Sequence, residues 1–370
     1  MKYYPKFSEN SPVSNTGAVR AQFNTPTPLS IDWLSVSCIP KSGQKRFTHF
    51  ERANYSTSVF NIIEFGFIDK IKYLTIARSP KSPLIPVDTC IIKFENWLLY
   101  NEGFLNECES ILEDFGYQYK SMNRIDICID IQNFANNLKP HNLIKGYFER
   151  KYHLVGNSKI KTILTNRVDL QYSYFRTGTN NSFISIYLYN KSLEFREVAV
   201  KQHIIELWKY CNMNFDKDVW RLEISIKTGN LSIMDPYTGE LLEINLTSIK
   251  EVGYLKHIFF TVLSKKFTFK IVGKGTKVSR WPKLVLFKNT KDIHHVPIQV
   301  NKTTDVTKAH KSAVIKLINY YDEIRNQNIT ESDKTRDLIL TYCKHHNLSE
   351  WLIHKTNYMN IINERDMLHE

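Results

Sequence analysis

The stretch that decides the fold is QYSYFRTGTNNSFISIYLYNK, which runs from Gln171 to Lys191. Its second half alternates isoleucine or leucine with serine, tyrosine or lysine, which is the period of a strand with one buried face. Its first half alternates in a similar way, and the Thr-Gly-Thr-Asn-Asn segment between the halves is typical of a turn. The stretch therefore predicts a β-hairpin. One face would carry four phenols and two cations, namely Tyr172, Tyr174, Arg176, Tyr187, Tyr189 and Lys191.

Two other segments repeat this design. Arg124–Ile131 reads RIDICIDI and Arg221–Lys227 reads RLEISIK, so each predicts a strand with a polar face and an aliphatic face. If these strands neighbour the hairpin, one sheet face collects the carboxylates of Asp126, Asp130 and Glu223 beside the tyrosines. An ordinary sheet whose charges pair across strands is the alternative, but such pairing does not explain the clustered tyrosines. We therefore interpret this face as an active site with a tyrosine as nucleophile.

The chemistry that such a face supports is phosphoryl transfer to a tyrosine. Carboxylates are hard oxygen ligands, so Asp126, Asp130 and Glu223 are candidate ligands for Mg²⁺ or Mn²⁺. A phenol with an ordinary pKa of about 10 has to lose its proton to attack, and a bound cation or Lys191 would favour the phenolate. An arginine can hold a phosphate through two hydrogen bonds. The candidates for this role are Arg124 and Arg221.

The composition favours an anionic partner and argues against several classes of protein. The chain has 370 residues, a net charge of +13 and 13% aromatic residues, which together suit binding and stacking on single-stranded nucleic acid. Its 6 cysteines include no C-x-x-C pair, so we expect reduced thiols rather than a disulfide framework or a zinc knuckle. No signal-peptide pattern and no apolar run long enough to cross a membrane is evident, so we expect a cytoplasmic protein.

The chain is predicted to have four regions. Residues 1–30 are rich in Pro, Ser, Asn and Thr and predict a flexible N-terminal arm. Residues 31–250 alternate strands and helices irregularly, which predicts an α+β fold with a central antiparallel or mixed sheet, helices on one face and an open catalytic face. Residues 251–310 form a basic extension, and residues 311–370 predict a small C-terminal helical region. Candidate DNA contacts in the extension are Lys265, Lys266, Lys270, Lys274, Lys277 and Arg280.

The order of several short motifs resembles that of a known family, the rolling-circle replication initiators of the Rep_trans type, found on plasmids and in phages. The likeness covers about residues 31 to 230 and includes the Asp32-Trp33 strand. The motifs are RIDICID from Arg124, Tyr174-Phe175 near Gly178, YNK from Tyr189 with Glu194 after it, and WRLEI from Trp220.

The resemblance implies an enzyme that nicks one DNA strand at an origin and stays linked to the 5′ phosphate through a tyrosine. It implies that Tyr174 is the nucleophile. Tyr172 and Tyr189 are alternatives, because Arg176 stands where the family has a glycine. Asp126, Asp130 and Glu223 would bind the metal, with Glu194 a further candidate. The implied partners are single-stranded or hairpin origin DNA and a helicase of the bacterial host.

Two other functions are consistent with the same residues. A metal-dependent nuclease would use the carboxylates but attack with water, and it would form no covalent adduct with DNA. A non-catalytic DNA-binding protein would use only the basic residues and would not nick supercoiled plasmid. Detection of a covalent protein–DNA adduct separates both from the tyrosine mechanism.

Overall fold

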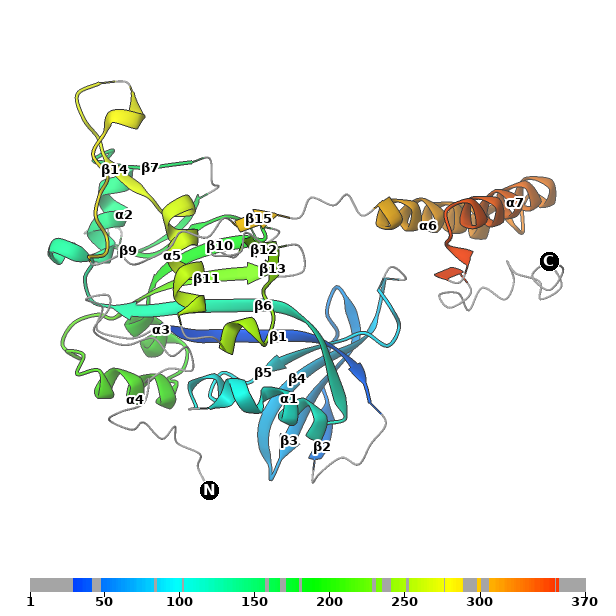
Figure 1. Cartoon of the computed structure of the whole chain (residues 1–370), viewed down its shortest axis with the longest axis horizontal. Coiled ribbons are helices and arrows are strands. Elements are labelled where there is room, and N and C mark those ends of the chain that lie inside the picture. Colours follow the sequence, from blue (N-terminus) through cyan, green and yellow to red (C-terminus); the bar gives the residue numbers. More distant parts are fainter. Residues whose placement is uncertain are drawn as a thin grey trace. The chain divides into compact units, whose positions relative to one another are not determined.

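The computed structural model describes residues 29–41, 48–82, 85–101, 103–156, 160–166, 171–179, 182–227, 231–234, 241–250, 253–275, 277–288, 298–300, 306–349 and 351–352. Its main element is a 10-stranded sheet with the strand order β2-β3-β4-β5-β1-β6-β11-β10-β9-β8 (Figure 1). The strands are β1 (Ser30–Pro40), β2 (Thr48–Arg52), β3 (Phe60–Ile68), β4 (Ile71–Pro80), β5 (Cys90–Phe94), β6 (Tyr117–Ile131), β8 (Ile160–Asn166), β9 (Gln171–Thr177), β10 (Ile184–Asn190) and β11 (Trp220–Lys227).

The predicted α+β fold with a central antiparallel sheet is confirmed. Every pairing from β1 across to β8 is antiparallel. The predicted hairpin is β9 and β10, and the two other predicted strands are β6 and β11, which lie side by side next to β10. Alternation of aliphatic and polar residues therefore located these four strands correctly, because each has one face buried against helices and one polar face.

The turn between β9 and β10 depends on a glycine. Gly178 has a φ of 86°, in the left-handed region, and a Cβ at this position would lie 3.0 Å from Ser185 Oγ and 3.1 Å from the Ile184 carbonyl oxygen. The Ser185 hydroxyl donates to the Thr179 carbonyl oxygen at 3.2 Å and so closes the turn. Only glycine fits this backbone without strain. The turn fixes the register in which Tyr174 lies opposite Tyr189.

Three helices cover the aliphatic face of the sheet, namely α1 (Phe104–Asp114), α2 (Pro140–Phe148) and α5 (Tyr254–Lys266). Phe175 of β9 makes edge contacts with Tyr147 of α2, with ring centroids 5.8 Å apart, and with Phe267 just after α5, at 6.1 Å. Phe94 of β5 packs edge-on against Phe104 of α1 at 5.1 Å. Figure 1 shows α5 crossing in front of β6 and β11. These contacts bury the isoleucine and leucine side chains that the sequence pattern assigned to the core.

Helices also reach the polar face, which departs from the expectation of helices on one face. α3 (Lys191–Glu197) and α4 (Gln202–Tyr210) follow β10, and a short 3₁₀ segment, Leu98–Tyr100, follows β5. Trp208 of α4 donates from its indole nitrogen to Asp130 on the polar face at 2.8 Å. One end of the polar face is therefore covered, and the catalytic face that we predicted is partly exposed at the hairpin, at Tyr174, Tyr187 and Tyr189.

The region after α5 contains a small two-stranded sheet and a protruding loop. β14 (Phe269–Ile271) pairs with β7 (Tyr152–Leu154), and the loop that follows contains a 3₁₀ turn at Val278–Arg280. A second small sheet consists of β12 (Leu231–Met234), β13 (Leu241–Glu243) and β15 (Ile298–Val300). The segment 251–310, predicted as one basic extension, thus contains a helix and strands of both small sheets.

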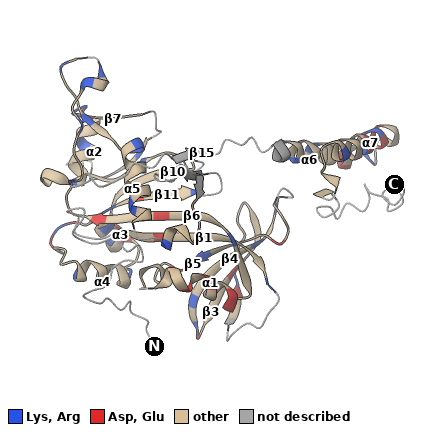
Figure 2. Ribbon diagram, viewed as in Figure 1, with Lys and Arg blue, Asp and Glu red and all other residues tan. Residues whose placement is uncertain are grey.

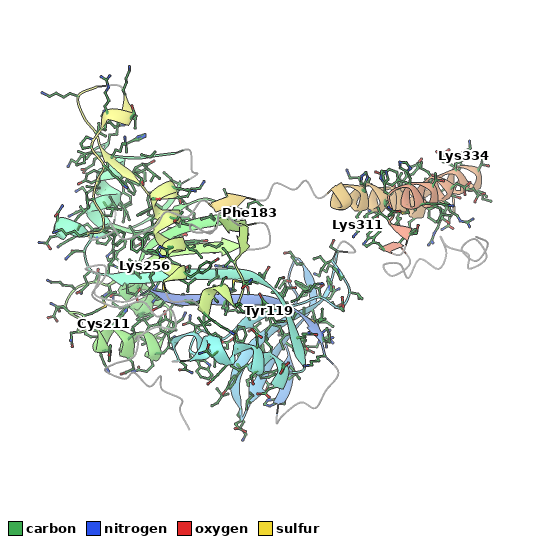
Figure 3. All side chains as sticks on the ribbon, viewed as in Figure 1. Tyr119, Phe183, Cys211, Lys256, Lys311 and Lys334 are labelled. Atoms are coloured by element: carbon green, nitrogen blue, oxygen red, sulfur yellow. The ribbon has the colours of Figure 1, made fainter. Side chains whose placement is uncertain are left out.

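The C-terminal part described in the structure is a helical hairpin, as the apolar stripes predict. It consists of α6 (Val306–Ile324) and α7 (Ile329–His345), and Figure 3 labels Lys311 on the first and Lys334 on the second. The Asn328 side chain caps α7 by accepting from the Glu331 N–H at 3.1 Å. The hairpin has its own small core of Val314, Ile318, Ile339, Cys343, Leu348 and Leu352.

The contacts divide the chain into two compact units. One unit contains residues 1–50, 66–75 and 91–301, and the other contains residues 51–65, 76–90 and 302–370. Of the predicted flexible arm, residues 1–28 lie outside the described residues, whereas Leu29 is fully buried and Ser30 begins β1. None of the helices in the described ranges is long and apolar enough to span a membrane.

Candidate active site

The register of four strands brings the predicted site residues onto one face. Asp126, Asp130 and Glu223 come from β6 and β11, which pair directly, and Tyr187 and Tyr189 come from β10 on the other side of β11. Figure 2 shows acidic segments on β6 and β1 in the middle of the sheet. Three successive rows cross the strands: Asp126, Ser225 and Ser185; Cys128, Glu223, Tyr187 and Arg176; and Asp130, Arg221, Tyr189 and Tyr174.

The covered end of this face contains a buried ion pair. Arg221 donates to both carboxylate oxygens of Asp130 at 2.7 Å, and it also donates to Asp32. The Arg221 side chain has no exposed surface and that of Asp130 is 2% exposed. Although burial opposes the charge, Asp130 and Asp32 hold the pKa of Arg221 well above its usual value. This end therefore holds a charged but internally satisfied cluster.

Asp32 is a site residue that the sequence analysis did not select. It accepts hydrogen bonds from Asn96 Nδ2 and from the Tyr100 hydroxyl, both at 3.1 Å, in addition to Arg221. His203 of α4 lies behind Asn96, with 2.6 Å between its Nε2 and the Asn96 Oδ1. Burial would raise the pKa of Asp32, but Arg221 and Lys191 keep it below the usual value. Burial lowers the pKa of His203 to about 4, so this imidazole is neutral at pH 7.

A β-bulge explains why Asp32 was missed. The register of β1 on β6 shifts between Ile31 and Trp33, and the shift leaves Asp32 as the extra residue. Simple alternation assigns Asp32 to the same face as the apolar Leu34, whereas a bulge re-aims the side chain. A carboxylate among apolar residues of a strand was the available signal.

The other part of the face holds two carboxylates whose negative charge is poorly compensated. Both are buried, with Asp126 2% and Glu223 8% exposed. The Tyr189 hydroxyl donates to Glu223 Oε2 at 3.1 Å, and Arg124 Nε donates to Asp126 Oδ1 at 2.8 Å. Burial, and then repulsion from Asp126 and Asp32, raises the pKa of Glu223 to about 8. Burial also raises the pKa of Asp126, against the opposing effect of Arg124. Of the two carboxylates, Asp126 pairs with Arg124, whereas Glu223 accepts only from a phenol, and the charges of Arg221 and Lys191 do not offset its burial.

The phenols differ in their surroundings. The rings of Tyr174 and Tyr187 are 6.3 Å apart, and the Arg176 guanidinium lies 5.0 Å from the Tyr187 ring centroid. Burial and then the neighbouring Tyr187 raise the pKa of Tyr174, and Arg176 opposes this rise. Burial and then Glu223 raise the pKa of Tyr189 well above its usual value. Tyr172 stacks on Phe148 at 5.1 Å, at the α2 end of the hairpin.

Lys191 is buried at the first turn of α3. Its side chain is 1% exposed, and its ammonium is 2.8 Å from Glu194 Oε2 and 5.3 Å from the Tyr189 ring centroid. Burial and then repulsion by Arg221 lower its pKa. Glu194, the further metal candidate, is thus the ion-pair partner of Lys191. Lys191 can bias the electrostatics of the tyrosines, but its buried position keeps it from reaching a bound strand in this conformation.

The predicted metal ligands fit a divalent cation only in part. Within the described part of the chain, no three side chains of His, Cys, Asp or Glu are grouped to hold a metal ion. Asp130 directs both oxygens to Arg221, so it offers none to a cation in this conformation. Asp126 and Glu223 remain, and Mg²⁺ is commonly bound through one or two carboxylates together with water and substrate phosphate. These two carboxylates therefore fit such a cation.

The two arginines that were predicted to hold a phosphate differ in their exposure to solvent. Arg124 is partly exposed, with 30% of its side chain accessible, and it lies beside Asp126. Arg221 has no accessible surface and is committed to two carboxylates. The expectation that Arg221 holds a DNA phosphate is therefore wrong for this conformation, because a sealed guanidinium cannot contact a ligand. Its position instead fixes β11 against β6 and β1.

Comparisons with known proteins show a distant likeness in fold to a solved structure. No protein-family model matches the chain, and no curated protein matches it. The chain is similar to a solved rolling-circle replication initiator protein from Geobacillus stearothermophilus. The two sequences are 12% identical, the TM-score is 0.40, and the match covers 69% of this chain and 92% of that chain.

The predicted basic contacts lie at the end of α5 and on the loop after β14. Lys265 and Lys266 are exposed in the last turn of α5, and Lys274, Lys277 and Arg280 are exposed on the loop, where Figure 2 shows basic segments. Lys270 has a different role. Its ammonium donates to the carbonyl oxygens of Val278 and Ser279, both at 2.8 Å, and so holds the loop closed.

Two substitutions on this loop are expected to change the salt dependence of DNA binding. Each phosphate contact to a single strand contributes about 0.7 to the slope of log affinity against log salt. Lys274→Ala combined with Lys277→Ala should therefore reduce the slope by about 1.4. Fluorescence anisotropy with a labelled oligothymidylate measures it. Lys41→Ala combined with Lys209→Ala is the matched control, because both lysines are exposed and paired with carboxylates. Equal slopes for both double variants would exclude this loop as a contact.

The raised pKa of Glu223 predicts how stability changes with pH. Its folded pKa of about 8 exceeds the usual 4.5, so its contribution to stability is complete below 4.5 and is lost as pH rises through 8. Glu223→Gln removes the charge and keeps the shape. We expect the variant to exceed the wild type in free energy of unfolding by about 1 to 3 kcal/mol at pH 9 and to differ little at pH 5. Urea denaturation at both pH values measures this, and a constant difference would contradict the assignment.

Proposed function

We propose that the chain is a metal-dependent DNA nickase and strand transferase that starts rolling-circle replication at an origin. The observation that carries the proposal is the hydrogen bond from Tyr189 to Glu223, because it joins the phenol-rich hairpin to the carboxylates of β6 and β11. A tyrosine, two carboxylates with little neighbouring positive charge and a partly exposed arginine then share one face of the sheet. These are the groups that phosphoryl transfer to a phenol requires.

Tyr174 is the proposed nucleophile. Its phenol lies on the partly exposed part of the face beside Arg176, and this cation favours the phenolate. The hydroxyl of Tyr189 is already bound to Glu223, whose negative charge disfavours the phenolate there. Tyr172 lies against Phe148 away from the carboxylates. Electrostatics thus disfavour Tyr189 and position disfavours Tyr172, so Tyr174 is the preferred candidate.

The chain's other groups have separate roles in the proposed reaction. Arg124 would hold the attacked phosphate, and the Tyr174 phenol would release its proton to water beside Arg176, which favours the phenolate. Mg²⁺ or Mn²⁺ at Asp126 and Glu223 would polarise the phosphodiester when bound. Attack by the Tyr174 oxygen forms a bond to phosphorus and releases the 3′ hydroxyl, which can prime synthesis. A later attack by a hydroxyl on the phosphotyrosine restores the tyrosine and rejoins the strand.

The exposed lysines of α5 and the loop after β14 would bind the DNA backbone without reading its sequence. The helical hairpin α6–α7 is the proposed place for contact with the origin or with a host helicase. The host cytoplasm is the proposed site of action.

A covalent adduct is the direct test of this function. The protein is incubated with Mn²⁺ and a labelled library of single-stranded oligonucleotides, denatured and run on a gel, and mass spectrometry maps the linked residue. We expect a labelled protein band with the DNA on Tyr174. Cleavage without an adduct would indicate a nuclease that uses water. No cleavage of the library or of supercoiled plasmid would indicate a non-catalytic DNA-binding protein.

A further inference from the structure

Three neighbouring strands bring two cations onto one indole ring. Lys93 lies on β5, Trp33 on β1 and Arg124 on β6, and β1 lies between the other two strands. The Lys93 ammonium is 3.7 Å from the Trp33 ring centroid, and the Arg124 guanidinium carbon is 4.5 Å from it. An indole ring attracts cations through its electron-rich face. The Trp33 ring therefore holds two positive charges close together although they repel each other.

The indole ring is held in place beside the candidate active site. Its nitrogen donates to Ser35 Oγ at 3.3 Å, and the Asn123 side chain donates to the same oxygen at 3.2 Å. Trp33 lies opposite Asp126 in the register of β1 and β6. Arg124 thus contacts Asp126 of the carboxylate pair, and Lys93 lies next to Arg124 on the shared Trp33 ring.

The positive charge of Lys93 is not neutralised. Arg124 pairs with Asp126, but Lys93 makes no ion pair with any carboxylate in the described ranges. Burial lowers the pKa of Lys93, and the more distant charges of Glu95 and Asp32 do not offset it, because Lys201 and Lys72 repel the ammonium. A half-buried ammonium without a counter-ion is costly unless an anion completes its surroundings. The ligand missing from this place is therefore negatively charged.

We propose that Lys93, held by Trp33 beside Arg124, forms a subsite for the DNA phosphate next to the attacked one that Arg124 would hold. The inference rests on the proposed function, because it is the adjacent carboxylates and tyrosines that make a phosphodiester strand the relevant anion. Lys93 supplies a point charge and Arg124 a planar fork, so two neighbouring phosphates of one strand are held, the attacked one by Arg124 and the next one by Lys93. Holding a neighbouring phosphate aligns the attacked one with Tyr174.

DNA binding without cleavage tests the subsite independently of the reaction. The full chain in EDTA is titrated with fluorescein-labelled oligothymidylate at a series of salt concentrations, and anisotropy gives affinity and salt slope. Lys93→Met should weaken binding about tenfold and reduce the slope by about 0.7, the value of one phosphate contact. Lys93→Arg should retain both. Trp33→Leu should weaken binding with little change in slope, because the charges remain but are no longer held.

Lys209→Met is the matched control, since Lys209 is exposed and paired with Glu206. Thermal melts establish that each variant is folded. If Lys93→Met binds as the wild type does, with an unchanged slope, the subsite does not exist. If Lys93→Met loses affinity while the wild type forms no adduct with DNA, the subsite stands and the proposed nicking activity fails.

Discussion

Tyr174→Phe is expected to abolish the covalent adduct and to slow strand cleavage by about a thousandfold or more. The substitution removes one oxygen atom, and that atom is the proposed nucleophile, so no other side chain can restore the same bond to phosphorus. DNA binding should be unchanged, because the ring and its contact with Tyr187 remain. Cleavage of a labelled oligonucleotide with Mn²⁺, measured beside binding in EDTA, separates the two effects.

The neighbouring tyrosines provide the controls for this prediction. Tyr172→Phe should leave cleavage within about twofold of the wild type, because its hydroxyl has no proposed role. Tyr189→Phe should slow cleavage but keep the adduct, because it removes the donor to Glu223 and not the nucleophile. If the adduct is lost only in Tyr189→Phe, the mechanism stands and the nucleophile is Tyr189. If no tyrosine variant reduces cleavage, the tyrosine mechanism fails.

Arg221→Met should be the most destabilising single change in the site. It removes the partner of two buried carboxylates, and breaking a buried pair from one side costs about 3 to 5 kcal/mol. Urea denaturation followed by tryptophan fluorescence measures the loss, since Trp208 contacts the same carboxylate. Arg221→Lys should recover only part of it, because an ammonium cannot reproduce the two-pronged contact with Asp130.

Arg196→Met is the control for this comparison. Arg196 pairs with Asp218 at 3.3 Å, but its side chain is 60% exposed, so its removal should cost less than about 1 kcal/mol. A similar loss in both variants would mean that the buried cluster contributes no more than a surface pair. Addition of Asp130→Asn to Arg221→Met should recover stability, because it removes one of the two uncompensated charges.

The sequence was a good guide to the strands and a poorer guide to what covers them. Alternation in β6, β10 and β11 follows directly from a sheet with one buried face, so their shared polar surface could be predicted. It could not be foreseen that α4 closes one end of that surface, because the contact of Trp208 with Asp130 joins residues far apart in the chain. Arg221 was consequently taken for a ligand contact when it is a sealed structural cation.

The sequence analysis did not select Asp32 and Lys93, and the reason is the same for both residues. Asp32 reaches the cluster through a bulge, which breaks the alternation on which the strand assignments depend. Lys93 lies in the five-residue strand β5, too short for its alternation to stand out, and its contact with Trp33 depends on strand order rather than on spacing. The sequence pattern predicts which residues share one face of a strand. Strand order and bulges, which the pattern does not reveal, decide which side chains of different strands meet.

The turn at Gly178 is a position where one substitution is expected to have a large effect on the proposed enzyme. A slip of one residue between β9 and β10 would turn Tyr174 to the opposite side of the sheet and would turn the buried Phe175 out of the core. A methyl group at Gly178 is therefore expected to disturb the hydrophobic core and the proposed nucleophile together.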